Sequence, residues 1–157
     1  MRIEAVTVSD KASAGINEDK SGPAIERVLM EGLPEAAIDR CLVPDGLDPL
    51  LKALERHAAE GADWILTTGG TGPSPRDWTP EATAVFCNRE LPGIAEYLRA
   101  ESLKETPNAV FSRLIAGMSG TVFVVNLPGS ERAATFCTKL LAPLLEHGRR
   151  MSPGERH

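Results

Sequence analysis

The glycine-rich segment at residues 69–72 constrains the fold most, because it connects an apolar run to a helix start. The apolar run ends at residues 64–66 (WIL), and Gly-Gly-Thr-Gly follows after two threonines. Glycine accepts positive φ and has no Cβ, so the backbone N–H groups of such a loop can surround an anion. Residues 79–81 (TPE) are typical of a helix start, with Thr79 as N-cap and Pro80 in the first helical position. The segment therefore predicts a strand, a phosphate-sized loop and a helix in succession.

Runs of β-prone residues alternate with amphipathic runs along the rest of the chain. The expected strands cover residues 3–8, 35–43, 63–67 and 121–125, and the expected helices cover residues 21–33, 48–60, 80–90, 94–104, 109–115 and 130–147. Residues 11–20 are expected to form a loop, and residues 92–118 a small lobe at one edge of the sheet. This alternation predicts an α/β fold with a mostly parallel sheet and right-handed crossovers. We expect a single domain over residues 1–147 and a flexible C-terminal tail over residues 148–157.

The charge balance and the cysteines exclude several classes of protein. The formal net charge is −5 and the pI is near 5.2, which argues against general binding to nucleic acid or to an anionic membrane surface. Cys41, Cys87 and Cys137 are far apart and form no C-x-x-C pair, as is typical of reduced cysteines in a cytosolic protein. Residues 1–10 look like a strand and not like a signal peptide, and no apolar stretch has the length of a membrane span. We therefore expect a cytoplasmic protein.

Small polar residues and carboxylates follow all four expected strands. Ser9-Asp10 follows the first strand, Asp45 the second, the glycine loop with Asp77 the third, and residues 126–130 (NLPGS) the fourth. In an open parallel sheet, ligands bind beyond the carboxyl ends of the strands. A carboxylate beside phosphates needs a cation between them, and oxygen ligands from two loops suit Mg²⁺. The sequence therefore predicts a phosphate-and-metal site with Asp45 and Asp77 as the metal ligands.

Plainer interpretations remain open for each of these features. A glycine-rich turn after a strand can be a tight βα connection, and the loop at residues 69–72 matches neither the P-loop nor the dinucleotide-binding pattern. Asp45 lies in Pro-Asp-Gly, an ordinary turn tripeptide. Trp78 could stack on a planar ring or could simply be a half-buried loop aromatic. The three histidines pair with no plausible nucleophile along the sequence, which argues against a Ser-His-Asp hydrolase.

Three sequence blocks resemble a known family. They are SDKASAG (9–15) with DKSGP (19–23), TTGGTGPSPRDWTPEAT (67–83) and NLPGS (126–130). The chain resembles the molybdopterin adenylyltransferases of molybdenum-cofactor biosynthesis, the MogA/MoaB-type molybdopterin-binding domains, over residues 3–147. The resemblance implies a three-layer α/β sandwich with helices on both faces of the sheet, assembled as a homotrimer.

The resemblance also implies a reaction and a set of site residues. The phosphate of molybdopterin would be joined to AMP from Mg-ATP, with release of pyrophosphate. Catalysis and metal binding would fall to Asp45 and Asp77. Contacts to the phosphates and the nucleotide would come from Gly69, Gly70, Thr71, Gly72 and Pro73. Contacts to molybdopterin would come from Ser9, Asp10, Ser112, Asn126, Pro128 and Gly129, although Ser112 could instead cap a short helix.

The sequence departs from the family pattern in two places. Lys11 stands where the family commonly has Arg, which keeps the charge but loses a bidentate phosphate contact. Pro75 replaces a second basic residue that often precedes Arg76. The short C-terminus is typical of the MoaB-like branch, whereas the RD-x-TPEAT block is typical of the MogA-like branch.

Two other functions compete with the adenylyltransferase. The chain could be a non-catalytic, MoaB-like carrier that binds molybdopterin and passes it to a molybdenum-insertion protein. It could also be a nucleotide or phosphosugar hydrolase, but neither His nor Glu lies inside the glycine loop to act as a general base. A pure carrier has no need of metal-holding carboxylates beside an anionic ligand, so Asp45 and Asp77 favour catalysis.

Overall fold

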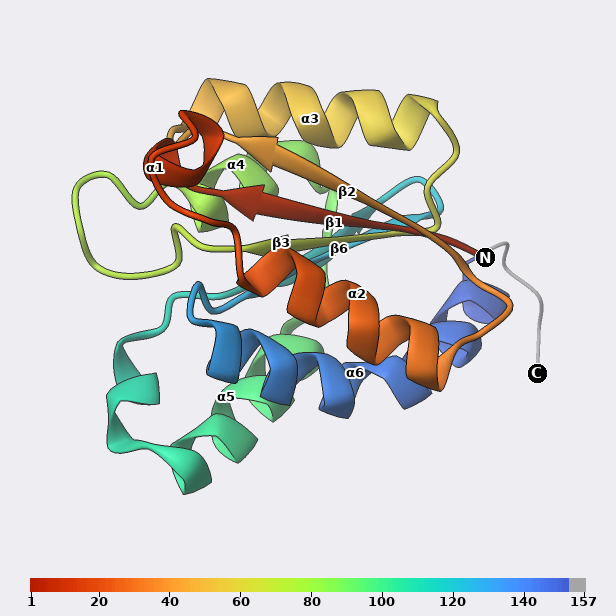
Figure 1. The fold of residues 1–157 in the computed structure, drawn as a ribbon. Helices are drawn as coiled ribbons and strands as arrows, with labels where there is room; N and C mark the ends of the chain where they lie inside the picture. The colour runs from red at the N-terminus through yellow and green to blue at the C-terminus, as the bar shows by residue number, and fades with distance from the viewer. Residues whose placement is uncertain (153–157) are drawn as a thin grey trace.

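Six strands form one sheet in the computed structural model of the protein, which describes residues 1–152 (Figure 1). The strands are β1 (Arg2–Val8), β2 (Ala37–Val43), β3 (Trp64–Thr68), β4 (Arg89–Glu90), β5 (Ala116–Ser119) and β6 (Val122–Leu127). Their order across the sheet is β2-β1-β3-β6-β5-β4. The first four strands in this order are parallel, while β5 runs antiparallel to both β6 and β4. The prediction of a mostly parallel sheet is therefore confirmed.

Helices cover both faces of the sheet (Figure 1). They are α1 (Asp10–Ser13), α2 (Ser21–Gly32), α3 (Leu47–Ala59), α4 (Thr79–Phe86), α5 (Pro92–Glu105) and α6 (Glu131–Met151), with a 3-10 helix, η1 (Pro107–Phe111). Successive residues of a strand point to opposite faces. Ile3 and Ala5 therefore pack under α2, α5 and α6, while Val6 and Val8 pack under α3 and α4. The central strands are apolar on both faces, as expected of parallel strands covered on both sides, and the α/β prediction is confirmed.

The structure differs from the sequence prediction at the edge of the sheet that follows β6. The predicted helix over 109–115 is replaced by η1, and the missed strand β5 pairs with β6 through a tight turn at Gly120, whose φ is +58°. The sequence of β5, AGMS, has no β-branched or aromatic residue, so it carries no strand signal of its own. Its strand conformation comes from pairing with its neighbours, including the two-residue β4.

The helix ends also differ from the prediction. The first turn after β1 is helical (α1, Asp10–Ser13) although residues 11–20 were expected to form a loop, and the Ser9 hydroxyl accepts a hydrogen bond from the backbone N–H of Ala12 (3.2 Å). Helix α4 ends at Phe86, four residues before its expected end, because the chain turns extended at Cys87 to enter β4. Helix α6 continues to Met151, past the expected end at residue 147. The last part of the expected tail, residues 153–157, lies outside the described residues.

The extra turn of α6 packs on a buried tryptophan. The Nε1–H of Trp64 donates to the carbonyl of Leu145 (3.1 Å), and the ring stacks on Phe123 with centroids 4.2 Å apart. Gly148 lies so close to this ring that a Cβ there would be 2.6 Å from Trp64 Cζ2. The absence of a side chain at residue 148 therefore lets the helix approach the sheet.

This contact predicts an unusual effect of a glycine-to-alanine change in a helix. Gly148→Ala should destabilise the protein by about 1–3 kcal/mol, because the overpacking outweighs the gain of up to ~1 kcal/mol in helix propensity. Gly93→Ala in α5 is the matched control, since a Cβ there meets open space. Urea unfolding of both variants tests the prediction. Equal or higher stability of Gly148→Ala would contradict it.

Among the described residues, no helix combines the length and the apolar character needed to cross a membrane.

Candidate active site

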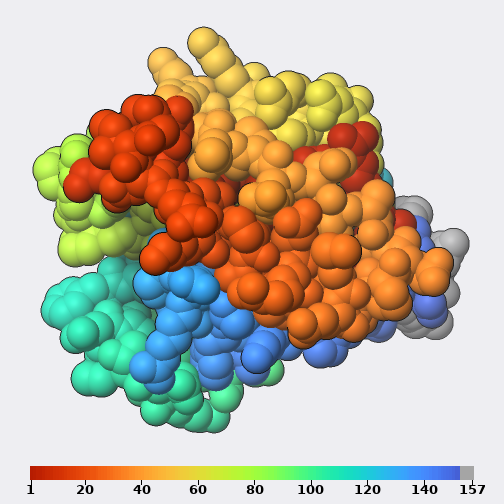
Figure 2. Space-filling model, viewed as in Figure 1, coloured from red at the N-terminus to blue at the C-terminus, as the bar shows by residue number. Residues whose placement is uncertain are grey.

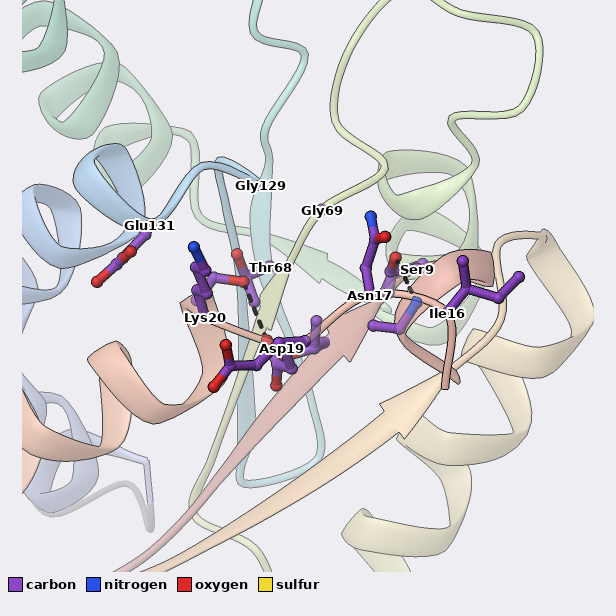
Figure 3. A pocket seen from close by; sticks show the side chains of 14 residues that line it. Ser9, Ile16, Asn17, Asp19, Lys20, Thr68, Gly69, Gly129 and Glu131 are labelled. Carbon is purple, nitrogen blue, oxygen red and sulfur yellow. Dashed lines mark hydrogen bonds between the residues drawn. The ribbon is translucent and has the colours of Figure 1, made fainter. Parts of the chain in front are cut away.

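The loops after β1, β3 and β6 meet at the carboxyl ends of the parallel strands and enclose a polar cavity of about 640 Å³ (Figure 3). Figure 2 shows this end of the molecule hollowed between the red-orange N-terminal segment, the yellow-green glycine loop and the blue start of α6. Three of the predicted site residues, Ser9, Gly69 and Gly129, line the cavity. The placement follows from the topology, because parallel strands end at the same edge of a sheet.

The glycine loop has a backbone shape that only glycine adopts readily. Gly69 and Gly70 have φ values of +98° and +63°, in the left-handed region that other residues avoid. A Cβ on Gly69 would strike the carbonyl oxygen of Val8, and a Cβ on Gly70 would strike the hydroxyl of Thr79. A Cβ on Gly129, in the loop after β6, would lie 3.1 Å from the Cα of Gly69. At this point the two loops approach each other backbone to backbone.

Thr79 has a different role from the predicted one. Helix α4 begins at Thr79 itself and has no side-chain cap, so the predicted N-cap is wrong. The Thr79 hydroxyl instead donates to the carbonyl of Gly69 (2.8 Å), and its backbone N–H donates to the carbonyl of Gly70 (3.1 Å). Thr79 thus holds the glycine loop against the start of α4, and the dipole of that helix favours negative charge beside the loop.

The side chains of the two predicted metal ligands each accept a hydrogen bond from a loop backbone. The Asp45 backbone N–H donates to Oδ1 of Asp10 (2.9 Å), and the Asp10 N–H donates to Oδ2 of Asp45 (3.3 Å), so the pair ties the end of β1 to the end of β2. Oδ2 of Asp77 accepts from the backbone N–H of Ser74 (3.0 Å) inside the glycine loop. Within residues 1–152, the Oδ1 atoms of Asp45 and Asp77 accept no hydrogen bond, so each has an oxygen available to a cation.

A second, largely apolar cavity of about 260 Å³ lies on the other side of the glycine loop. Its lining includes the predicted residues Thr71, Gly72, Pro73, Ser112 and Pro128. The Oγ of Ser112 is buried and has no hydrogen-bond partner within the described chain. A buried hydroxyl without a partner costs about 1–3 kcal/mol, so the position is unfavourable unless a ligand supplies the partner.

This orphaned hydroxyl predicts opposite effects on stability and on binding. Ser112→Ala should leave the free energy of unfolding unchanged or raise it by up to about 1 kcal/mol, and should weaken molybdopterin binding about tenfold. Thr83→Val is the matched control, because it removes the oxygen that accepts from Asn126 Nδ2 (2.8 Å) and leaves one of the two buried N–H bonds of that amide without a partner, which should lower stability. Urea unfolding and fluorescence titration with molybdopterin measure the two effects. Unchanged molybdopterin binding by Ser112→Ala would show that Ser112 does not contribute to the binding site.

Asn126 is fully buried, and its side chain has partners inside the protein. Its Nδ2 donates to the hydroxyls of Thr67 (3.0 Å) and Thr83 (2.8 Å), and its Oδ1 accepts from the backbone N–H of Ile115 (3.3 Å). These bonds join β6 to β3, α4 and the segment before β5. The predicted contact with molybdopterin stays a prediction, and in the structure the side chain positions the surrounding elements.

Sequence reasoning missed several residues that line or shape the site. Lys20 is the only basic residue among those lining the polar cavity, beside the carboxylates of Glu18, Asp19 and Glu131. Asp19 accepts hydrogen bonds from the Thr7 hydroxyl (3.0 Å) and the Gly22 N–H (3.0 Å), so it fixes the start of α2 to β1. The predicted metal ligands Asp45 and Asp77 do not line this cavity, so the metal stays a prediction. Asp19 and Lys20 lie in the DKSGP block, but nothing in the sequence indicated their side-chain contacts.

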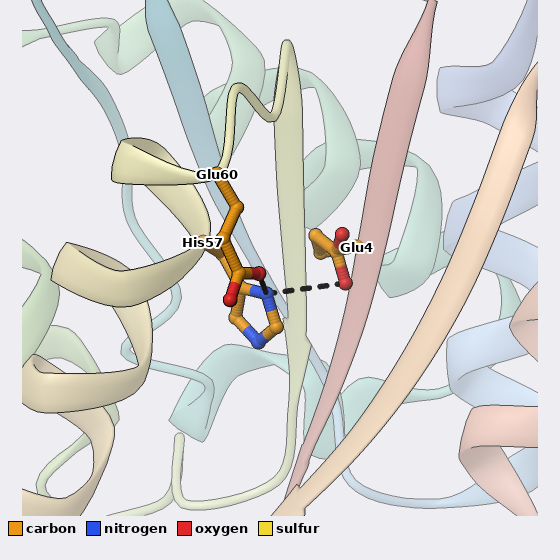
Figure 4. Close-up of side chains that lie close together, drawn as sticks. All are labelled: Glu4, His57 and Glu60. Atoms are coloured by element: carbon orange, nitrogen blue, oxygen red, sulfur yellow. Dashed lines mark ion pairs between the residues drawn. The ribbon is translucent and has the colours of Figure 1, made fainter.

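A second group of metal-ligating side chains lies on β1 and α3, outside this site (Figure 4). Nδ1 of the buried His57 is 3.2 Å from Oε2 of Glu4 and 3.4 Å from Oε2 of Glu60. Nη2 of Arg56 lies 2.9 Å from the other ring nitrogen, Nε2. A guanidinium can only donate, so Nε2 is the acceptor and Nδ1 carries the ring proton. Because a proton occupies the nitrogen that faces the carboxylates, and Arg2 already pairs with Glu4, we interpret this group as a partly buried polar network, with Glu4 and His57 inside and Glu60 exposed.

The fold and the cavities define a class of protein, the α/β domains with a mostly parallel sheet and a polar cavity at the carboxyl ends of its strands. By sequence, the chain belongs to the family described as probable molybdopterin binding domain, which matches residues 4–147. The family resemblance that the sequence blocks indicated is therefore confirmed.

Individual relatives agree with this assignment. The chain is 39% identical over 149 residues to a molybdopterin adenylyltransferase of Helicobacter pylori (strain J99), and the match spans 94% of this chain and 85% of the relative. The crystal structure of the molybdopterin biosynthesis enzyme MoaB from Thermus thermophilus is 41% identical, with a TM-score of 0.87 over 98% of this chain and 97% of that one. A structure of MogA is 34% identical, with a TM-score of 0.88 over 96% and 98% of the two chains.

Proposed function

We propose that the protein is a molybdopterin adenylyltransferase of molybdenum-cofactor biosynthesis, a nucleotidyltransferase that joins AMP from Mg-ATP to the phosphate of molybdopterin. The observation that carries this proposal is the position of the glycine loop, between a polar cavity that Gly69 lines and an apolar cavity that Thr71 and Gly72 line. Two substrates bound on either side would present their phosphates to the same backbone. The names of the relatives support the same reaction.

The chemistry needs positioning and charge neutralisation more than a protein nucleophile. An oxygen of the molybdopterin phosphate attacks the α-phosphorus of ATP, the bond to the β-phosphate breaks, and pyrophosphate leaves. Backbone N–H groups of residues 70–72 would bind the phosphate oxygens as charge develops on them, and the dipole of α4 would favour that charge. The Gly69 N–H already donates to the carbonyl of Leu127 (3.3 Å). Lys20, which also lines the polar cavity, would add one positive charge.

We propose that Asp45 and Asp77 hold Mg²⁺ at this site. Each carboxylate keeps one oxygen without a hydrogen bond, and carboxylate oxygens with substrate phosphates and water are the ligands that Mg²⁺ prefers. The bound ion would neutralise charge on the phosphates. The other residues of the site would orient both substrates and hold the two carboxylates in place.

A non-catalytic carrier of molybdopterin is the alternative function. A carrier would use the same glycine loop and the apolar cavity that Ser112 lines, but it would not need two carboxylates with oxygens free of hydrogen bonds. Conversion of [α-³²P]ATP with purified molybdopterin and Mg²⁺ separates the two functions. Molybdopterin-AMP and pyrophosphate in equal amounts establish the transferase, whereas tight molybdopterin binding without turnover would leave a carrier.

We further propose a cytoplasmic homotrimer that passes its product to a molybdenum-insertion protein. Exposed apolar side chains support an interface with another chain, and Val110 and Phe111 of η1 are 60% and 66% exposed. These residues lie beside the apolar cavity, so association would also shield the site from water. Sedimentation equilibrium tests the assembly.

A further inference from the structure

The segment 112–114 connects the apolar cavity to the glycine loop. Arg99 of α5 donates from Nε to the carbonyl of Ser112 (3.1 Å) and from Nη2 to the carbonyl of Leu114 (2.7 Å). These carbonyls flank Arg113, so α5 fixes the backbone on both sides of that residue. The segment is thereby held in place from one side by a single guanidinium.

From this fixed backbone, Arg113 reaches both ends of the exposed loop 72–77. Its backbone N–H donates to the carbonyl of Thr71 (2.9 Å), its Nε to the carbonyl of Gly72 (2.8 Å) and its Nη2 to the carbonyl of Asp77 (2.7 Å). The same guanidinium pairs with the carboxylate of Glu81 in the first turn of α4. One side chain therefore ties together the beginning of the loop, its end and the helix that follows.

The Glu81 partner keeps the guanidinium in this orientation at neutral pH. The hydrogen bond from Arg113 lowers the pKa of Glu81 below its usual value, and the same bond raises the pKa of Arg113. Because the pKa of the carboxyl group is lowered in the folded state, the ion pair is complete at neutral pH and is lost only as pH falls through that lowered pKa.

We infer that Arg113 is a positioning residue that couples the apolar cavity, which Ser112 lines, to the Asp77 carboxylate. This inference rests on the proposed function. Arg113 is the sequence neighbour of Ser112 and donates to the backbone of Asp77, so a shift of its segment moves both groups. It fixes where the Asp77 carboxylate lies relative to the glycine loop. Its planar guanidinium is needed, because a lysine ammonium is a single point charge and cannot span Gly72, Asp77 and Glu81 together.

The first test is kinetic. Arg113→Gln should lower kcat about 10- to 100-fold and raise the Mg²⁺ concentration for half-maximal activity, while KM for ATP changes little, because a small displacement of a reacting group has this effect. Arg113→Lys should recover only part of the activity. Arg132→Gln is the matched control, because that arginine is 84% exposed and makes only a surface ion pair with Glu105.

A double-mutant cycle separates positioning from general loss of structure. If Arg113 acts through Asp77, then Arg113→Gln should lower kcat no further in an Asp77→Asn background. Independent, multiplicative losses would overturn the inference. Unchanged kcat and unchanged Mg²⁺ dependence in Arg113→Gln would also overturn it.

Hydrogen exchange keeps the test independent of the proposed function. In the protein without substrates, exchange of the amides of Ser74, Arg76 and Asp77 should accelerate at least about tenfold in Arg113→Gln and in Glu81→Gln, and should not change in Arg132→Gln. If the wild type makes no molybdopterin-AMP, the proposed function fails while this result still decides whether Arg113 holds the loop. Unchanged exchange in both loop variants would overturn the positioning role, and Glu81→Gln serves if Arg113→Gln does not fold.

Discussion

Asp77→Asn is expected to reduce the rate of molybdopterin-AMP formation by a factor of at least about 100, which corresponds to ~2.7 kcal/mol of transition-state stabilisation. The change removes one negative charge and keeps the shape of the side chain. Asn can still accept the hydrogen bond from the Ser74 N–H that holds the loop (3.0 Å in the wild type). A loss of rate would therefore report the loss of a metal ligand and not of the loop structure.

Asp45→Asn should have a similar effect, because its side-chain oxygen can still accept from the Asp10 N–H (3.3 Å in the wild type). Both rates are measured with [α-³²P]ATP over a range of Mg²⁺ concentrations. Molybdopterin binding and the urea midpoint should remain close to those of the wild type. Full activity in either variant would exclude that carboxylate from the metal site.

Gly69→Ala is expected to have the largest effect on stability, a loss of about 3–5 kcal/mol, together with loss of substrate binding. The new Cβ would strike the carbonyl oxygen of Val8, the last residue of strand β1, whose backbone is paired with Val43 of β2. The left-handed φ of +98° adds strain.

A second glycine separates strain from collision. Gly61 has φ of +86°, but a Cβ there meets nothing within 4 Å. Gly61→Ala should therefore cost only about 1 kcal/mol, the penalty for a positive φ alone. Urea unfolding of the two variants measures the difference. Equal losses of stability in the two variants would mean that the collision with the Val8 carbonyl adds nothing to the cost of Gly69→Ala.

How much could be predicted from the sequence depended on whether a feature was local. The glycine loop and the parallel strands have strong local signals, since apolar runs and Gly-Gly-Thr-Gly carry them in consecutive residues. Strand β5 (AGMS) has no such signal, because its conformation comes from pairing with β6. The role of Asn126 was equally hidden, because its partners are as many as 59 residues away along the chain.

Within the candidate site, residue types were easier to predict than their contacts. The sequence indicated Ser112 and the carboxylates at the strand ends, but the missing partner of Ser112 Oγ is visible only in three dimensions. Arg113 was missed as a functional residue because its acceptors Gly72, Asp77 and Glu81 lie 41, 36 and 32 residues away. Long-range contacts of this kind depend on the assembled fold and leave no pattern in a single sequence.

The backbone contact between Gly69 and Gly129 has a consequence for engineering the protein. With a Cβ on Gly129 only 3.1 Å from the Cα of Gly69, the loops after β3 and β6 have no side chains between them to absorb a change in length or course. A graft from a relative with a different ligand preference should therefore exchange both loops as one unit. Residues 75 and 76 are exposed, so substitutions can be introduced there alone, provided that the Ser74 N–H keeps its hydrogen bond to Asp77 Oδ2 and Arg113 keeps its bonds to Gly72 and Asp77.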